Sequence, residues 1–154
     1  MAFDKASEYL EKKGYKDRVM QFEVSSATVE LAAEAVGTDP ARIAKSLTFM
    51  VDEKPVMILC AGDAKVNNSK FKGFFHTKAK MLTPEQVHDL IGHDIGGVCP
   101  FGINEGVTVY LDESLKRFDI VYPACGSSSS AVRLSIPELE EVSGFTQWAD
   151  VTVY

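Results

Sequence analysis

The chain has 154 residues, 45% of them hydrophobic and 25% charged, which are ordinary proportions for a globular protein and exclude a disordered or fibrous chain. The length predicts a single domain spanning residues 1–154. The formal net charge of −6 excludes a protein that coats nucleic acid without specificity, because such binding depends on Lys and Arg side chains that neutralise phosphates, so any nucleic-acid contact should be local.

The first part of the chain predicts two helices and one strand. Apolar residues recur at helical spacing over Ala2–Lys13, and Gly14 should end this helix. Charged residues interrupt the same stretch, so it lacks the apolar core of a signal peptide. Val19–Val24 predicts a strand, and Thr28–Val36 predicts an alanine-rich helix that ends at Gly37.

A central strand is predicted at Ile43–Val51, and it carries an unusually placed charge. Side chains alternate between the two faces of a strand, which puts Lys45 on the same face as Ile43 and Leu47. Lysine is almost never fully buried without a partner. Lys45 should therefore reach solvent from the strand end, pair with another group, or face a polar cavity, where its charge could hold a phosphate or desolvation could make it a base.

The next segments predict a hairpin and a capped helix. Val56–Ala61 should pair back on the central strand and be buried on both faces. The apolar run that contains it is far shorter than the roughly 20 residues that span a membrane. Thr83, Pro84 and Gln86 form the pattern of a capping box with a proline in the first turn, which predicts a helix through Ile91.

The last third predicts short strands and one more helix. Ser135 and Glu138 form a second capping box, for a helix through Val142. The predicted strands are Val107–Leu111, Ile120–Tyr122 and Ala131–Leu134. Because regular crossover helices do not separate the strands, we expect an α+β fold with a mixed, curled (partial-barrel) β-sheet and surrounding helices.

The three cysteines are Cys60, Cys99 and Cys125, and their spacing matches no zinc motif. In a chain without an export signal they should remain free thiols, so we expect a cytoplasmic protein with no membrane span and no metal site. Cys99 could act as a nucleophile if one of the three histidines lay beside it in space, and a purely structural thiol is the alternative.

Two loops and one charged segment are candidates for binding. The segment from Gly96 to Gly102 holds three glycines and a proline, so its backbone could meet a small ligand or simply form a turn. Gly126 precedes the run Ser127–Ser130, which could supply hydroxyls to a site or form a polar hairpin turn. Five lysines and no acidic residue lie between positions 65 and 80, and this local excess could meet a phosphate backbone or remain a solvated surface.

Several of these segments, in this order, resemble the YbaK family of aminoacyl-tRNA editing domains. The matching segments are Ile43-Ala44-Lys45-Ser46-Leu47, Gly62-Asp63, Gly96-Gly97-Val98-Cys99-Pro100-Phe101-Gly102 and the loop at Gly126, within residues 20–142. The strand lysine followed by the Gly-Gly-x-x-Pro loop is the most specific part. The family is similar to the editing domain inserted in bacterial prolyl-tRNA synthetases, and its freestanding members hydrolyse wrongly charged aminoacyl-tRNA, especially tRNA for proline that carries alanine or cysteine.

The resemblance implies a trans-acting deacylase that hydrolyses the ester of a small mischarged amino acid (Ala, Cys, Ser or Thr) without a cofactor. Lys45 matches the family's essential lysine, which is expected to engage the phosphate or ribose at the tRNA 3′ end. Water or a group on the substrate could then attack the ester, so no protein nucleophile is required. The expected substrate-binding residues are Ser46, Gly96, Gly97, Val98, Cys99, Pro100, Gly126, Ser127 and Ser128.

The resemblance also gives the charged segment a partner, the acceptor end of an aminoacyl-tRNA. The expected RNA-facing residues are Lys65, Lys70, Lys72, Lys78 and Lys80, and transient association with an aminoacyl-tRNA synthetase is a further expectation. Some relatives carry a histidine or paired glycines in the late loop where this chain has Ser127 and Ser128, so the resemblance does not assign the amino acid. Two alternatives remain: a non-catalytic module that binds tRNA 3′ ends or aminoacyl nucleotides, and a thiol hydrolase that uses Cys99.

Overall fold

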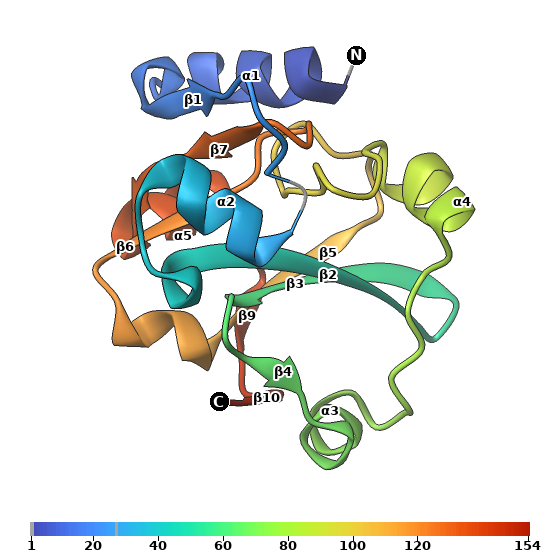
Figure 1. Ribbon diagram of the computed structural model, residues 1–154. Coiled ribbons are helices and arrows are strands. Elements are labelled where there is room, and N and C mark those ends of the chain that lie inside the picture. Colours follow the sequence, from blue (N-terminus) through green and yellow to red (C-terminus); the bar gives the residue numbers. More distant parts are fainter. Residues whose placement is uncertain (1, 27) are drawn as a thin grey trace.

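The protein is built around one curled, six-stranded sheet, as the computed structural model of residues 2–26 and 28–154 shows (Figure 1). Its strand order is β8-β6-β2-β3-β5-β9. The strands are β2 (Ile43–Val51), β3 (Lys54–Ala61), β5 (Thr108–Asp112), β6 (Ile120–Pro123), β8 (Leu134–Ser135) and β9 (Gln147–Ala149). β2–β3 and β6–β8 are antiparallel, whereas β2–β6, β3–β5 and β5–β9 are parallel. The mixed, curled sheet confirms the predicted fold class.

The predicted central hairpin is the longest strand pair of the sheet. Asp52 and Glu53 connect β2 to β3 with positive φ angles of 51° and 64°, which is typical of a two-residue type I′ turn. Pro55 lies opposite Met50. Proline has no N–H to donate, so Met50 and Pro55 must form a non-hydrogen-bonded pair, whose N–H and C=O groups point away from the partner strand. Because hydrogen-bonded and non-hydrogen-bonded pairs alternate, this pair determines which residues of β2 bond to β3 and which direct their backbone outward.

Among the described residues, five helices surround the sheet: α1 (Ala2–Lys12), α2 (Val29–Val36), α3 (Asn68–Phe75), α4 (Pro84–Gln86), which continues as a π-turn over Val87–Ile91, and α5 (Ile136–Val142). Single 3-10 segments occupy Lys16–Arg18, Pro40–Arg42 and Glu113–Arg117. Figure 1 shows α1 on one side of the β2–β3 hairpin and α3 on the other, and Ala32 and Ala33 of α2 pack against Ile43 of β2. Within the described residues, no helix has the length and apolarity needed to cross a membrane.

Each side of the hairpin has its own apolar cluster. On one side, Leu10 of α1 packs in the cluster that contains Met57 and Leu59. On the other, Phe71 of α3 packs against Phe49, with ring centroids 4.9 Å apart. Six consecutive residues of β3 from Val56 onward are buried, which confirms the prediction that this strand is covered on both faces.

The helix ends predicted at Thr28, Gly37, Thr83 and Ser135 are all present. Thr28 caps α2 by accepting a hydrogen bond from Leu31 N (3.1 Å), and Gly37 ends the helix with a φ of 83°. Both capping boxes form, the first at Thr83 and the second at Ser135. These features depend on residues three or four positions apart, which is why the sequence reveals them.

Two strand predictions need correction at their ends. β1 covers only Val19–Gln21, three residues short of the predicted end at Val24. The predicted strand Ala131–Leu134 divides at Arg133 into β7 (Ser130–Val132) and β8. The division has a structural cause, because β7 pairs with β1 whereas β8 pairs with β6.

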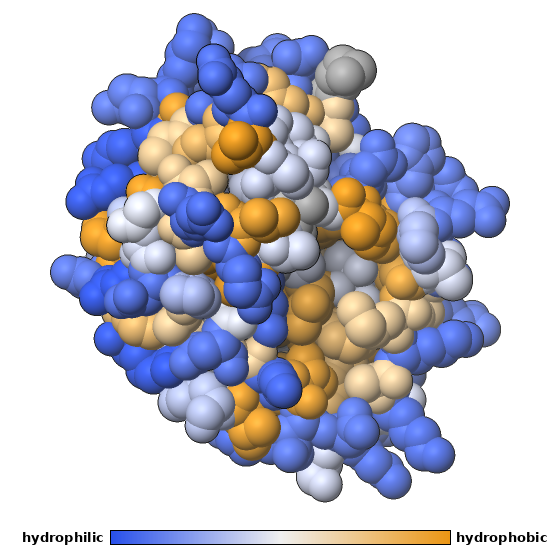
Figure 2. All heavy atoms as spheres, viewed as in Figure 1, coloured by the Kyte–Doolittle hydropathy of each residue, from blue (hydrophilic) through white to orange (hydrophobic). Residues whose placement is uncertain are grey.

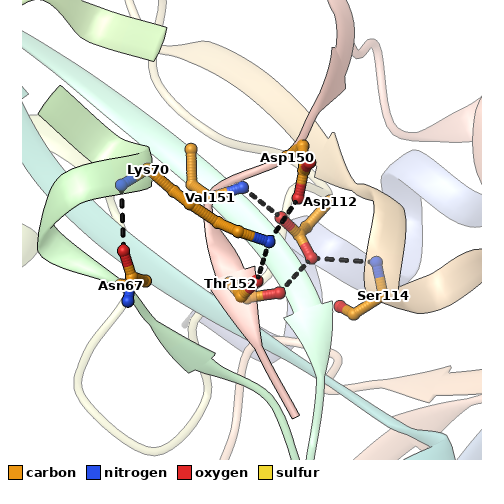
Figure 3. A network of polar contacts seen from close by, with 7 residues as sticks. All are labelled: Asn67, Lys70, Asp112, Ser114, Asp150, Val151 and Thr152. Atoms are coloured by element: carbon orange, nitrogen blue, oxygen red, sulfur yellow. Dashed lines mark hydrogen bonds and ion pairs between the residues drawn. The ribbon is translucent and has the colours of Figure 1, made fainter. Parts of the chain in front are cut away.

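The C-terminal segment is held by a buried carboxylate (Figure 3). β10 (Thr152–Val153) pairs with β4 (Lys65–Val66), and neither strand was predicted. Asp112 has no exposed surface and accepts hydrogen bonds from Ser114 N (2.9 Å), Val151 N (3.0 Å) and Thr152 Oγ1 (2.6 Å). We call these four residues the Asp112 cluster. It anchors the end of the chain beneath the sheet edge next to α3.

Candidate active site

The edge of β2 that faces β6 has a gap in its backbone pairing. β6 pairs with β2 only at Ile43 and Ala44. Farther along the same edge, Leu82 N donates to Thr48 O (3.1 Å) and Met50 N donates to Lys80 O (2.9 Å). Within the described residues, positions 45–47 have no strand partner on this edge, so the sheet is open between its two neighbours.

The backbone of Ser46 points into this gap. Along an antiparallel pair, every second residue directs its N–H and C=O away from the partner strand. Thr48 and Met50 bond outward in this way, and Ser46 has the same phase. The gap therefore offers a backbone donor and a backbone acceptor to a ligand that completes the strand pairing.

A cavity of about 250 Å³ occupies the gap. Six successive residues of β2, 43–48, line it. Side chains from both faces of the strand reach the opening, because the cavity lies at the edge of the sheet. The remaining walls are formed by Ser26, Thr28, Val29, Ala32, Met81, Leu82, Ile95, Gly96, Val98, Tyr122, Ala124, Ser130 and Ala131. Figure 2 shows apolar side chains gathered along the middle of this face, with hydrophilic ones at its margins. The site is small and largely apolar, with a few polar groups, as is usual for small-ligand sites.

Lys45 brings a positive charge to this cavity. It lines the cavity, is half-buried and lies opposite Cys60 across the hairpin. In the described part of the chain, no carboxylate forms an ion pair with its ammonium group. Burial raises the pKa of the Cys60 thiol to about 12, and the charge of Lys45 opposes that rise. Lys45 thus lies at a cavity, as one of the three alternatives from the sequence required, but the walls of this cavity are largely apolar rather than polar.

Ser46 contributes a hydroxyl that has no partner. Ser46 lines the same cavity, but its Oγ is buried beneath the surface and makes no hydrogen bond to any described residue. The hydroxyl of Ser130, in contrast, accepts from Cys125 N (3.2 Å) and donates to Ser127 O (3.1 Å). An unpaired buried hydroxyl is unfavourable for the stability of the fold.

The two predicted glycine loops are joined by their backbones. Gly126 N donates to Gly97 O (3.0 Å), although the two residues lie far apart in the sequence. A Cβ atom at Gly97 would come within 2.5 Å of Ser127 N, so only glycine fits there. Gly126 has a φ of 81°, and its Cβ would meet the backbone oxygen of Ala2. The contact makes the two loops one rigid wall.

The predicted binding residues divide into three groups by position. Lys45, Ser46, Gly96 and Val98 line the cavity of the gap. Gly97, Gly126, Ser127 and Ser128 line a neighbouring hollow, and Ile95 borders both spaces. Cys99 and Pro100 are buried behind the loop. Thr48, Ile95 and Met81 could not be picked out from the sequence, because their place at the opening depends on which segments pair with β2.

Cys99 is poorly placed for a nucleophile. Its Sγ lies 3.5 Å from His93 Nε2, so a histidine is indeed nearby, but both side chains are almost completely buried. His93 Nε2 also lies 2.8 Å from Phe101 O, and burial lowers the pKa of this histidine. Burial raises the pKa of the Cys99 thiol well above its ordinary value. This arrangement favours the structural interpretation of Cys99.

The five predicted RNA-facing lysines lie on the side of the molecule where α3 is found, and all are exposed. Lys70 is held by Asp150 Oδ1 (3.1 Å) and Thr152 O (2.9 Å). Lys72 and Lys78 line a separate hollow together with Asn68 and Ser69. None of the five lines the cavity at Lys45 as described. Within the described residues, no group of three or more His, Cys, Asp or Glu side chains could hold a metal ion.

The comparison that decides the family is a match of residues 23–142 to the model of the aminoacyl-tRNA editing domain. The chain belongs to this family. The match includes the gap, Lys45 and both glycine loops, and it confirms the resemblance seen in the sequence motifs.

Individual relatives agree with this assignment. The chain is 52% identical over 134 residues to the uncharacterized protein YwhH of Bacillus subtilis (strain 168), which covers 86% of this chain and 85% of that one. It is 29% identical over 125 residues to a proline--tRNA ligase of Geobacillus sp. (strain WCH70), covering 80% of this chain but only 22% of the ligase.

Solved structures show the same fold over the whole length. A crystal structure of "a putative trans-editing enzyme for prolyl tRNA synthetase" superposes with a TM-score of 0.89 at 30% identity, covering 99% of this chain and 98% of that one. The hypothetical protein APE2540 superposes with a TM-score of 0.85 at 23% identity, covering 97% and 99%. This editing domain is therefore related to those of prolyl-tRNA synthetases.

Proposed function

We propose that the protein is a trans-acting deacylase that hydrolyses the ester between a small mischarged amino acid and the 3′ end of a tRNA. The observation that carries the proposal is the charge of Lys45 beside a small cavity in the sheet gap of an editing domain. The ligase match and the prolyl-tRNA editing neighbour favour tRNA for proline as the first candidate.

The residues of the cavity have distinct roles in this proposal. Lys45 binds the terminal phosphate or ribose and orients the ester, because a compact ammonium group suits a phosphate oxygen. The backbone of Ser46 and of Gly96 holds the amine and the carbonyl of the amino acid. Water attacks the carbonyl carbon, the ester C–O bond breaks, and the free amino acid and a tRNA with a free hydroxyl are released. No protein nucleophile takes part.

The size of the cavity supports a small amino acid. At about 250 Å³ it lies below the roughly 300–1,000 Å³ of drug-sized ligand sites. The joined glycine loops limit its expansion, because Gly97 and Ser127 are already in backbone contact. The candidate amino acids are those that the family resemblance implies, alanine, cysteine, serine and threonine.

The exposed lysines near α3 would hold the acceptor stem. Lys72 and Lys78 are the main candidates, because the ammonium group of Lys70 is engaged by Asp150 and Thr152. These contacts would be local cationic contacts to phosphates in a chain whose net charge is −6. A transient complex with a synthetase in the cytoplasm belongs to the same proposal.

The test is a panel of tRNAs charged with alanine, cysteine, serine or threonine and incubated with the purified protein. We expect at least one ester to be cleaved well above its spontaneous rate. If no ester is cleaved faster than spontaneously, the deacylase proposal fails. Tight binding of charged tRNA without cleavage would instead support the non-catalytic binding module.

A further inference from the structure

Two large apolar side chains stand exposed at the mouth of the Lys45 cavity. Ile95 is 64% exposed and Met81 is 59% exposed, and both residues line the cavity. Single exposed apolar residues are common on protein surfaces, but two that share one opening form a surface that a ligand can cover. Ile95 also lines the neighbouring hollow, so it lies between the two spaces.

Both side chains are carried by backbone that the fold holds in place. Met81 lies between the two residues whose backbones bond to the outer edge of β2, at 2.9 and 3.1 Å. Gly97 N donates to Asp94 O (3.0 Å), which closes a turn around Ile95. The Asp94 carboxylate at the start of this turn lies 2.7 Å from His88 Nδ1. The apolar surface at the mouth is therefore presented by anchored segments, which lowers the entropy lost when a ligand binds.

The size of the cavity indicates which part of a substrate would reach this surface. In the proposed function Lys45 binds the terminal phosphate or ribose, and the amino acid lies inside the cavity. A volume of about 250 Å³ suits a small aminoacyl group and leaves the terminal base at the opening. A nucleobase has a flat apolar face, which proteins hold by stacking it on aromatic or apolar side chains. Ile95 and Met81 supply such side chains at the opening.

We propose that Ile95 and Met81 hold the terminal base of the tRNA by packing against the faces of its ring, with the amino acid inside the cavity and the base outside it. This inference rests on the proposed deacylase function and concerns the part of the substrate that lies beyond the ester. Packing against the face of a ring reads no hydrogen-bond pattern. Adenine and guanine are therefore held about equally well, whereas a nucleotide without a base is held poorly.

The test measures the binding of a tRNA for proline that carries alanine through a 3′-amide, which cannot be hydrolysed as an ester. The terminal nucleotide of this tRNA has either its adenine or no base. We expect the wild type to bind the adenine form more tightly by about fivefold or more. Ile95→Ala and Met81→Ala should each weaken binding of the adenine form and leave binding of the form without a base within about twofold of the wild type.

Val153→Ala is the matched control, because it shortens an exposed apolar side chain that lines a separate hollow. It should bind both tRNAs as the wild type does. Ile95→Leu conserves the volume of the apolar side chain and should keep most of the preference for the adenine form. Circular dichroism confirms that each variant is folded, as expected for changes at exposed side chains.

Three results would overturn the inference. They are equal binding, or no binding, of the two tRNAs by the wild type, a preference for the adenine form that either alanine variant at the mouth leaves unchanged, and an equal loss of preference in Val153→Ala. The inference and the deacylase proposal can fail separately. A preference that depends on Ile95 and Met81 in a protein that cleaves no ester would support the inference and contradict the deacylase proposal, whereas ester cleavage without any preference for the base would do the reverse.

Discussion

Single residues in this protein have roles that can be tested without any substrate. Gly97 is a tightly constrained glycine of the site, because the atom a side chain would meet belongs to the backbone of Ser127 rather than to a flexible side chain. Gly73, in the interior of α3, has nothing within 4 Å of the position a Cβ would take. The two glycines are a matched pair for mutation.

Gly97→Ala should destabilise the protein by about 1–3 kcal/mol and separate the two glycine loops, because one of the two backbones must shift. Gly73→Ala should stabilise it by about 0.5–1 kcal/mol, because alanine favours the helix. Thermal or urea unfolding measures both effects. Equal stability of the two variants would show that the loop contact does not constrain Gly97.

Asp63 acts through Arg117 in the fold. The guanidinium donates to both carboxylate oxygens, at 2.6 and 3.0 Å, and these hydrogen bonds lower the pKa of the Asp63 carboxyl. Because the pKa is lowered on folding, this contribution to stability is present above the ordinary aspartate pKa and is lost as the pH falls through the lower, folded value. Asp63 of the Gly62-Asp63 motif thus has a structural role, which is its contact with Arg117.

Asp63→Asn should lose less stability than the wild type on acidification. The slopes of the free energy of unfolding against pH should differ mainly below about pH 5, where the wild type loses the contribution of this carboxylate. Urea unfolding at a series of pH values gives this directly. Parallel stability curves for the two proteins across the acidic range would mean that the Asp63–Arg117 contact contributes nothing to the pH dependence.

At the scale of secondary-structure elements, the Asp112 cluster holds the C-terminal strand in place. Asp112→Ala removes the carboxylate that accepts from three donors. The buried backbone N–H groups of Ser114 and Val151 then lose their acceptor. We expect a loss of at least about 3 kcal/mol in the free energy of unfolding and faster hydrogen exchange at Val151. Asp150→Ala is the control, because its ion pair with Lys70 is largely exposed and should contribute no more than about 1 kcal/mol. Similar stability for both variants would contradict the account of the cluster.

The elements that could be predicted are those with local signals. Helix ends at Thr28, Thr83 and Ser135 were predictable because a cap is decided within one turn. The hairpin was predictable because its two apolar strands are joined by a two-residue turn. α3 was missed although Asn67 caps it, because lysines and a glycine weaken its helical pattern.

The elements that could not be predicted depend on distant partners. β10 is only two residues long and pairs with residues 65 and 66. The division of residues 131–134 into β7 and β8 follows from two different partner strands. Such pairings are set by the topology of the whole chain, so no window of local sequence contains them.

At the scale of the whole molecule, the site is a product of topology. Lys45 could be located from the alternation of one strand, but the cavity beside it exists because β6 and residues 80–82 meet the same edge of β2 without meeting each other. The lysines that would hold the acceptor stem lie outside that cavity. A tRNA must therefore contact two separate regions of one domain if the proposed function is correct.

The most direct test of this account is the single-turnover rate of ester cleavage by the wild type and by Lys45→Ala, on whichever charged tRNA the panel shows to be cleaved fastest. The two proteins are compared at equal, saturating concentration, and circular dichroism confirms that both are folded. We predict that Lys45→Ala lowers the rate by about 100-fold or more, because the only cation at the cavity among the described residues is lost. A variant that retains the wild-type rate would contradict the claim that Lys45 organises the active site.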